Sequence, residues 1–239
     1  MQARLCLLFL TTFSILADDW PQWLGPQRDG VWREKGIVKK FNGAPKLRWK
    51  VSIGGGYAGP AVADGRVYVL DRQLSKGVRN PSNPFARGQL LGTERVLCLN
   101  EADGKLLWKH EYDCPYAISY PAGPRCTPTV DGDRVYVLGA MGDLFCFKAK
   151  TGKLVWKKDF KKDFGAKVPI WGFAAHPLVD GNKIICLVGG EKGTTMAFNK
   201  ITGEVLWSAL PGPDLGYCPP MIYEAGGRRQ LIIWHPRAL

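Results

Sequence analysis

One eleven-residue motif occurs three times in this chain, and each copy ends in tryptophan. Each copy has a small residue ten positions before the tryptophan and a turn glycine four positions before it. The copies are residues 98–108, 146–156 and 197–207, so their tryptophans lie 48 and 51 residues apart (156 − 108 and 207 − 156). A period of this length is typical of solenoids, propellers and arrays. The chain is therefore predicted to consist of repeated units.

A second motif precedes each tryptophan motif and predicts a hairpin. It is Asp-Gly between two apolar runs, at residues 64–65, 131–132 and 180–181. Asp-Gly in this context is a strong hairpin signal, because glycine accepts the positive φ of a tight turn. The run after each turn is apolar on both strand faces, which indicates a strand covered on both sides. Each unit then contains four short strands, and four-stranded antiparallel sheets stacked radially make an all-β propeller.

The tryptophan motif resembles the PQQ-like repeat of quinoprotein-type β-propellers, roughly Ala-x-Asp-x-x-Thr-Gly-x-x-x-Trp. The third copy fits best, with Ala197, Asn199, Thr202, Gly203 and Trp207. The resemblance extends over residues 44–236 and implies that each tryptophan ring docks near the turn of a neighbouring blade. The residues implied in this docking are Trp49, Gly104, Trp108, Thr151, Gly152, Trp156, Thr202, Gly203 and Trp207. The stretch 20–30 also looks like the start of exported bacterial members.

Residues 1–17 have the composition of a secretory signal. Arg4 supplies the positive start, residues 5–16 the apolar core, and Ala17 a small residue before two aspartates. The apolar run is too short for a transmembrane span, which needs roughly 20 residues. We expect export to the periplasm or the cell exterior without a transmembrane anchor. An N-terminal extension, residues 18–43, and a propeller domain, residues 44–239, follow.

The repeat count predicts an unfinished ring. Residues 45–49 resemble an isolated tryptophan strand whose own unit is missing, and residues 220–234 begin a unit that has no tryptophan motif. The expected architecture is three full blades plus partial first and last blades. Such a chain would be a truncated fragment of a longer propeller.

The charge distribution of the chain limits which partners are expected. The net charge of +12 and the pI near 9.4 permit contact with anionic surfaces. The densest basic cluster, residues 157–162, is interrupted by Asp159, so it is interpreted as a solvated loop and no nucleic-acid partner is expected.

Residues 72–95 are expected to be an insertion that replaces a short hairpin turn.

No cofactor or metal site is predicted. The sequence has no Cys-x-x-Cys or His-x-x-x-His spacing. Residues 54–59 match Gly-x-Gly-x-x-Gly, but Pro60 and a predicted strand follow where a dinucleotide site needs a helix. The resemblance implies that true quinone dehydrogenases hold pyrroloquinoline quinone (PQQ) against adjacent disulfide-linked cysteines, with calcium nearby. No adjacent cysteine pair occurs here, and PQQ with calcium stays an alternative.

Long connections rich in aromatic residues predict a ligand face. They cover residues 110–125, 157–175 and 208–217 and are expected to cross one end of the ring. The candidate ligand residues are Arg125, Trp171, His176 and Tyr217. Aromatic groups interleaved with cations suit sugar or peptide recognition. The alternative is that these aromatic side chains only cover the blade ends.

These observations favour an exported, non-catalytic binding or scaffold propeller with a protein or polysaccharide partner. Two alternatives stay open. One is a PQQ- and calcium-dependent dehydrogenase of alcohols or sugars whose catalytic residues lie beyond Leu239. The other is a carbohydrate-binding module.

We predict that the chain expressed alone self-associates or is only marginally stable. Open blade faces expose apolar sheet surface, and repeat arrays without capping units are poorly soluble. Light scattering coupled to size-exclusion chromatography measures this. A monodisperse monomer with a sharp thermal transition would contradict the prediction.

Overall fold

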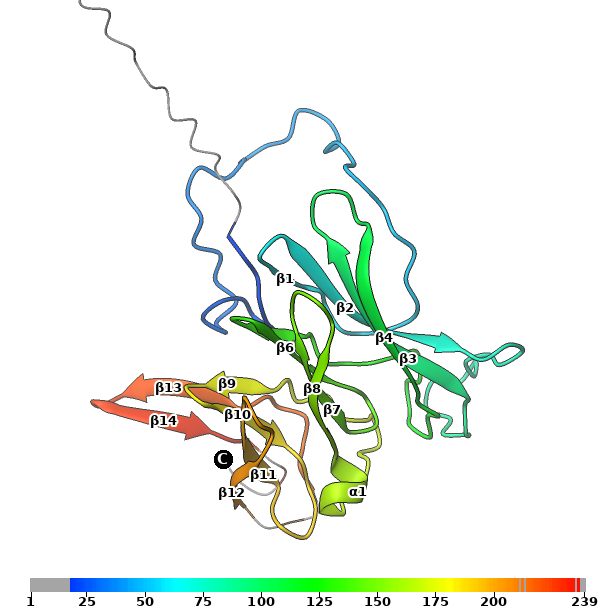
Figure 1. Ribbon diagram of the computed structural model, residues 1–239, viewed down its shortest axis with the longest axis vertical. Helices are drawn as coiled ribbons and strands as arrows, with labels where there is room; N and C mark the ends of the chain where they lie inside the picture. Colours follow the sequence, from blue (N-terminus) through cyan, green and yellow to red (C-terminus); the bar gives the residue numbers. More distant parts are fainter. Residues whose placement is uncertain (1–17, 211, 213, 235, 237–239) are drawn as a thin grey trace, which may run out of the picture.

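The computed structural model describes residues 18–210, 212, 214–234 and 236. The predicted signal, residues 1–17, lies outside the described residues. Over the described ranges the chain forms three four-stranded antiparallel sheets, one two-stranded sheet and one short helix (Figure 1). All sheets are meanders in which each strand pairs with the next along the chain.

The first blade comprises β1 (Ala61–Ala63), β2 (Arg66–Leu74), β3 (Gly92–Asn100) and β4 (Leu106–Asp113). The second comprises β5 (Thr129–Asp131), β6 (Arg134–Leu138), β7 (Asp143–Lys148) and β8 (Leu154–Asp159), after which α1 (Phe160–Phe164) forms one turn of helix. The third comprises β9 (Leu178–Asp180), β10 (Lys183–Leu187), β11 (Thr195–Asn199) and β12 (Val205–Ala209). The two-stranded sheet is β13 (Met221–Ala225) and β14 (Arg228–Ile232).

The first Asp-Gly pair forms the predicted turn, whereas Asp131 and Asp180 are the last residues of their strands and the turns there are residues 132–133 and 181–182. Between β1 and β2, Asp64 and Gly65 both adopt positive φ, 50° and 69°, and Ala63 pairs with Arg66. Two consecutive residues with positive φ characterise the turn whose twist matches that of paired strands. The hairpin prediction is therefore confirmed at this position.

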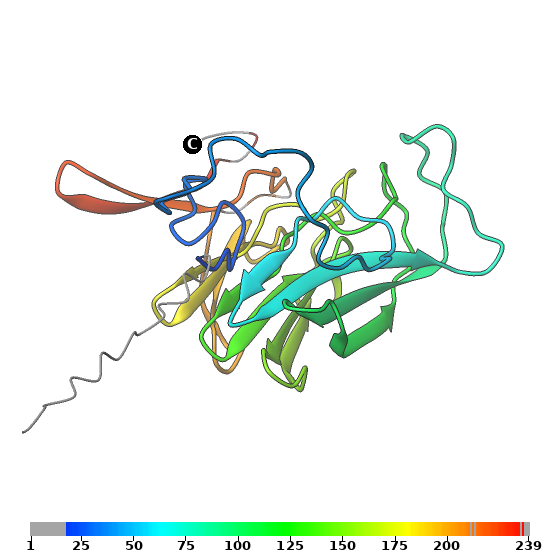
Figure 2. The same ribbon diagram turned by 90° about the horizontal axis from the view of Figure 1, so that it is seen from above.

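The sheets stack face to face, with the short strands innermost. β1 contacts β5, and β5 contacts β9, so the blades radiate from one side, as Figure 2 shows. Blades one and two enclose a core that includes Tyr68, Phe145 and Phe147. Blades two and three enclose a larger core around Leu144, Phe160 and Phe198. The prediction of an all-β propeller with an incomplete ring is confirmed.

A tryptophan joins each blade to the next. The Trp108 Nε1–H donates to the Ala149 carbonyl at 2.9 Å, and the Trp156 Nε1–H donates to the Lys200 carbonyl at 3.2 Å. Both carbonyls lie three residues before a glycine whose Cα faces the ring. A Cβ on Gly152 would be 2.6 Å from Cδ2 of Trp108, closer than atoms can approach. Glycine is required here by space as well as by its φ of 69°.

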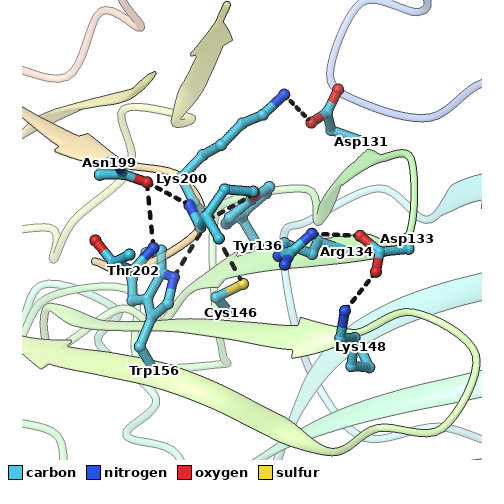
Figure 3. A network of polar contacts seen from close by, with 11 residues as sticks. Asp131, Asp133, Arg134, Tyr136, Cys146, Lys148, Trp156, Asn199, Lys200 and Thr202 are labelled. Carbon is cyan, nitrogen blue, oxygen red and sulfur yellow. Dashed lines mark hydrogen bonds and ion pairs between the residues drawn. The ribbon is translucent and has the colours of Figure 1, made fainter. Parts of the chain in front are cut away.

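The same carbonyls accept a second hydrogen bond, from a tyrosine on the second strand of the preceding blade. The Tyr68 hydroxyl donates to Ala149 at 3.3 Å and the Tyr136 hydroxyl donates to Lys200 at 2.9 Å. Figure 3 shows Tyr136 and Trp156 approaching the Lys200 main chain, while the Lys200 ammonium reaches Asp131 at 2.6 Å. Both lone pairs of each carbonyl are thus used. Each joint is therefore polar at its centre and apolar around it.

The threonines of the motif stabilise the turn. The Lys153 N–H donates to Thr151 Oγ1 at 3.4 Å, and the Glu204 N–H donates to Thr202 Oγ1 at 3.3 Å. Such side-chain bonds to the backbone two residues on are a common means of closing a turn.

The first and last tryptophans differ from the other two. Trp49 makes the usual joint, donating to the Glu101 carbonyl at 2.7 Å and covering Gly104, but the described residues 44–51 form no strand. The prediction of a strand at residues 45–49 is therefore wrong: the Trp49 ring holds this segment against the first blade without strand pairing. Trp207 is half-buried beside Ile222 of the β13–β14 sheet.

The N-terminal segment, residues 18–30, lies against the inner strands. Trp20 exchanges two backbone hydrogen bonds with Val62 of β1, at 2.9 and 3.0 Å, and the Val130 N–H of β5 donates to the Pro21 carbonyl at 2.8 Å. Arg28 is only 5% exposed and donates to the Pro177 carbonyl, just before β9, at 2.9 Å. It also donates to the Pro220 carbonyl, just before β13, at 3.2 Å.

The insertion is shorter than the sequence suggested. Residues 72–74 and 92–95 belong to β2 and β3, where Arg72 pairs with Glu94, so the projecting loop is residues 75–91. We call this loop the arm; it extends from the sheet at the right of Figures 1 and 2.

We predict that Gly152→Ala lowers the free energy of unfolding by about 2–5 kcal/mol. The left-handed backbone costs an alanine roughly 1–2 kcal/mol, and the clash with Trp108 adds about 1–3 kcal/mol. Gly132→Ala is the matched control, because Gly132 has a φ of 55° and open space around its Cα. Urea unfolding of both variants measures the difference. Equal destabilisation would show that the ring contact contributes nothing.

Candidate functional site at the inner ends of the blades

A cavity of about 310 Å³ opens where the connections enter the inner strands. Its lining residues are Tyr57, Tyr120, Arg125, Trp171, Ala174 and Tyr217. We call it the mouth cavity. Its walls are almost wholly apolar, and no acidic side chain of the described residues lines it. A neighbouring cavity shares Tyr217 and is lined in part by Asp214.

Four of the lining residues occupy one repeat position. Tyr57, Arg125, Ala174 and Tyr217 each lie four residues before an inner strand, which begins at residues 61, 129, 178 and 221 respectively. Each connection therefore delivers one side chain to the same end of the ring. The cavity is a consequence of the repeat and not of one loop.

Aromatic rings form its exposed wall. The Trp171 and Tyr217 rings lie 5.1 Å apart between centroids, with an angle of 37° between their planes. The backbone N–H of Trp171 donates to the Tyr217 hydroxyl at 3.3 Å. Trp171 is 44% exposed and Tyr57 52% exposed. Large aromatic groups left this open are typical of binding surfaces.

Arg125 forms the cationic part of the wall. Its guanidinium donates to the carbonyls of Ser119 at 2.9 Å and Tyr120 at 2.6 Å and also to that of Gly123. It lies 5.2 Å from the Tyr57 ring centroid. Burial lowers the pKa of Arg125 from its ordinary value, but the group stays charged, because arginine titrates far above neutrality.

A buried polar cluster lies next to Arg125 and supports the wall of the mouth cavity. Glu94 is fully buried and accepts hydrogen bonds from the Tyr112 and Tyr116 hydroxyls and, at 3.0 Å, from the Ala140 N–H. Burial raises the pKa of Glu94. The Arg72 guanidinium lies 3.9 Å from the Tyr116 ring centroid. This packing fixes Tyr116, whose centroid is 5.9 Å from the Arg125 guanidinium.

The arm forms the rim of the mouth cavity. The Tyr120 N–H donates to the Pro84 carbonyl at 2.6 Å, and Ser119 Oγ donates to the Phe85 carbonyl at 3.0 Å. The Phe85 ring meets the Tyr120 ring edge-on, with centroids 5.1 Å apart. The arm is thus attached to the cavity wall at its tip.

The structure brings together three of the four predicted ligand residues, Arg125, Trp171 and Tyr217. The fourth, His176, lies two positions beyond Ala174 and stacks on Trp23 of the N-terminal segment, with centroids 4.9 Å apart. Sequence reasoning missed Tyr57, Tyr120 and Ala174. The repeat position that Tyr57 and Ala174 share with Arg125 and Tyr217 was the available signal. Tyr120 lies in the aromatic connection 110–125 that the sequence singled out, but no repeat position distinguished it from the other aromatic residues there.

The described lining of the mouth cavity offers aromatic rings, one guanidinium and one alanine. In the described part of the chain no group of three or more His, Cys, Asp or Glu side chains is placed to hold a metal ion. The described lining of the mouth cavity contains no histidine, cysteine, aspartate, glutamate or lysine. No described helix is long and apolar enough to cross a membrane.

The stacked four-stranded sheets and their tryptophan joints define a β-propeller of repeated blades. A family model described as "Outer membrane protein assembly factor BamB" matches residues 92–229, more than half of the chain. The chain belongs to this family of PQQ-like propeller repeats.

Individual relatives carry different functions. Quinohemoprotein alcohol dehydrogenase ADH IIB of Pseudomonas putida is 33% identical over 143 residues, which is 55% of this chain and 20% of that protein. Outer membrane protein assembly factor BamB of Shewanella oneidensis is 33% identical over 95 residues, 38% of this chain and 24% of that protein. The chain thus spans about a quarter or less of these two relatives.

A solved structure agrees in fold. Quinohemoprotein alcohol dehydrogenase from Comamonas testosteroni superposes with a TM-score of 0.52 at 22% identity, covering 79% of this chain and 26% of that one. At this identity the likeness concerns the fold alone.

We predict a pH dependence of stability that arises from His176. Burial, and then the charge of Arg28, lowers the pKa of His176 from 6.5 to about 4. The folded state therefore favours the neutral ring. The stabilisation is present above the unfolded pKa and is lost as the pH falls from 6.5 towards 4, at about 1.4 kcal/mol per pH unit.

Urea unfolding at about pH 7 and about pH 5 measures this effect. The wild type should lose about 2 kcal/mol more between the two values than His176→Phe, which keeps a ring for Trp23 to stack on. Identical losses in the two proteins would rule out a depressed His176 pKa.

Proposed function

We propose that this chain is part of an exported, non-catalytic binding propeller whose mouth cavity receives an apolar side chain of a protein partner. The observation that carries the proposal is the convergence of repeat-equivalent side chains into an aromatic cavity without acidic, nucleophilic or metal-binding groups. Apolar clefts with a few fixed polar groups are the usual form of a binding site. Export is expected from the signal composition of residues 1–17.

A protein partner fits this cavity better than a polysaccharide. Sugar hydroxyls buried against a wall that is almost wholly apolar would lose hydrogen bonds to water and find few replacements. A phenylalanine, tryptophan or leucine side chain has no such cost and fills the pocket as an interface anchor. The BamB relative, which is named an assembly factor, is consistent with a scaffold role.

The dehydrogenase alternative is supported by the relatives that carry that name. PQQ with calcium would need several oxygen ligands around the ion. The described residues of the mouth cavity do not fit this requirement, since they supply tyrosine hydroxyls and one guanidinium and no carboxylate. The proposal accordingly assigns no step to a quinone.

Selection of a randomised displayed peptide library against the full chain tests the proposal. Peptides that bind should carry a large apolar residue, and Trp171→Ala should weaken them at least tenfold, as expected for an interface anchor. Trp32→Ala is the matched control, because Trp32 is 58% exposed and does not line the mouth cavity. A glycan array probed in parallel tests the polysaccharide alternative.

Two results would overturn the proposal. One is selected peptides whose affinity is the same for the wild type and Trp171→Ala. The other is saturable binding of PQQ and calcium by the full chain with alcohol-dependent dye reduction.

A further inference from the structure

The arm is cationic throughout. Residues 75–91 contain Lys76, Arg79 and Arg87 and no aspartate or glutamate. All three side chains are exposed, and none forms an ion pair with another described residue. Some cations on the blades are paired, such as the half-buried Lys148 and Lys200, each with an aspartate. The positive charge of the arm therefore has no ion-pair partner among the described residues.

This charge lies beside the mouth cavity. Pro84 and Phe85 are bonded to Tyr120 and Ser119 of the cavity wall, and Arg87 follows Phe85 by two residues. Phe85 is 59% exposed, which extends the aromatic surface out of the cavity and along the arm. An occupant of the cavity that continued along the arm would meet the Phe85 ring and then Arg87, two residues further along the chain.

Arg125 adds positive charge at the cavity itself. Its hydrogen bonds all go to backbone carbonyls, so no described carboxylate pairs with it. Glu94 lies behind Tyr116, fully buried and bonded to two tyrosine hydroxyls. The accessible surface formed by the mouth cavity and the arm therefore combines an apolar hollow with uncompensated cations.

We propose that this surface binds an acidic peptide segment that carries one large apolar side chain. The apolar side chain enters the mouth cavity, and the flanking carboxylates face Arg79 and Arg87 of the arm. Complementary charge gives such a complex its specificity and its rate of association. The inference rests on the proposed binding function and adds the chemistry of the partner.

Fluorescence anisotropy with a labelled peptide, Gly-Asp-Glu-Phe-Glu-Asp-Gly, titrated with the full chain tests the inference. The peptide should bind at low salt and weaken as salt rises, because the exposed charges are screened. A peptide with asparagine and glutamine in place of the acids should bind several-fold more weakly. A peptide with alanine in place of phenylalanine should lose at least tenfold.

Two double variants of the protein test which positive charges contribute to peptide binding. Arg79→Gln combined with Arg87→Gln should weaken the acidic peptide by about two- to fivefold per arginine, as for exposed ion pairs, and leave the neutral peptide unchanged. Lys150→Gln combined with Lys153→Gln is the matched control. These exposed lysines flank the β7–β8 turn, at the opposite end of the second sheet from Arg125.

The outcomes separate the two proposals. Equal loss in the arm variant and in the control variant, or equal affinity for acidic and neutral peptides, overturns the acidic-partner inference alone. Unchanged binding by Trp171→Ala overturns the mouth cavity as the site. Tighter binding of an oligogalacturonate that displaces the peptide would assign the surface to an anionic polysaccharide and overturn the peptide inference.

Discussion

The joint between neighbouring blades is the interaction on which the rest of the structure depends. A tryptophan ring lies on a glycine of the next blade while its N–H bonds to a carbonyl three residues earlier. The bond sets the rotation and height of one blade against the next, and the ring excludes water from it. Because every joint uses the same atoms, every blade presents the same end to the same side.

The mouth cavity follows from that regularity. Once the blades stack in register, the residue four positions before each inner strand arrives at a common point. The fold places these side chains, and the residue types decide what they bind: Tyr57, Arg125 and Tyr217 give an aromatic wall with one cation. The small Ala174 leaves room between them. A change of residue at this position would alter the ligand without altering the propeller.

The N-terminal segment, residues 18–30, connects parts of the fold that are distant in sequence. Arg28 is buried without a carboxylate partner in the described residues, and burial lowers its pKa to about 10. A buried cation of this kind needs hydrogen bonds to offset its lost hydration. It obtains them from carbonyls that precede β9 and β13, so it joins the third blade to the last two strands. Nothing in the spacing of residues 20–30 identifies those partners, which lie more than 140 positions away.

The sequence by itself determined the repeat, the turns and the blade joints. These depend on local backbone preferences, such as positive φ at Gly65 and Gly152, and on a tryptophan spacing that recurs along the chain. It also indicated Arg125, Trp171 and Tyr217, because long aromatic connections stand out from short hairpins. Tertiary structure alone decided that His176 packs under Trp23 and not in the cavity, and that Tyr120 completes the wall with Phe85 of the arm. The physical reason is that a side chain's direction at the end of a blade depends on segments distant in sequence. The repeat pattern of the sequence does not reveal which distant segments pack there.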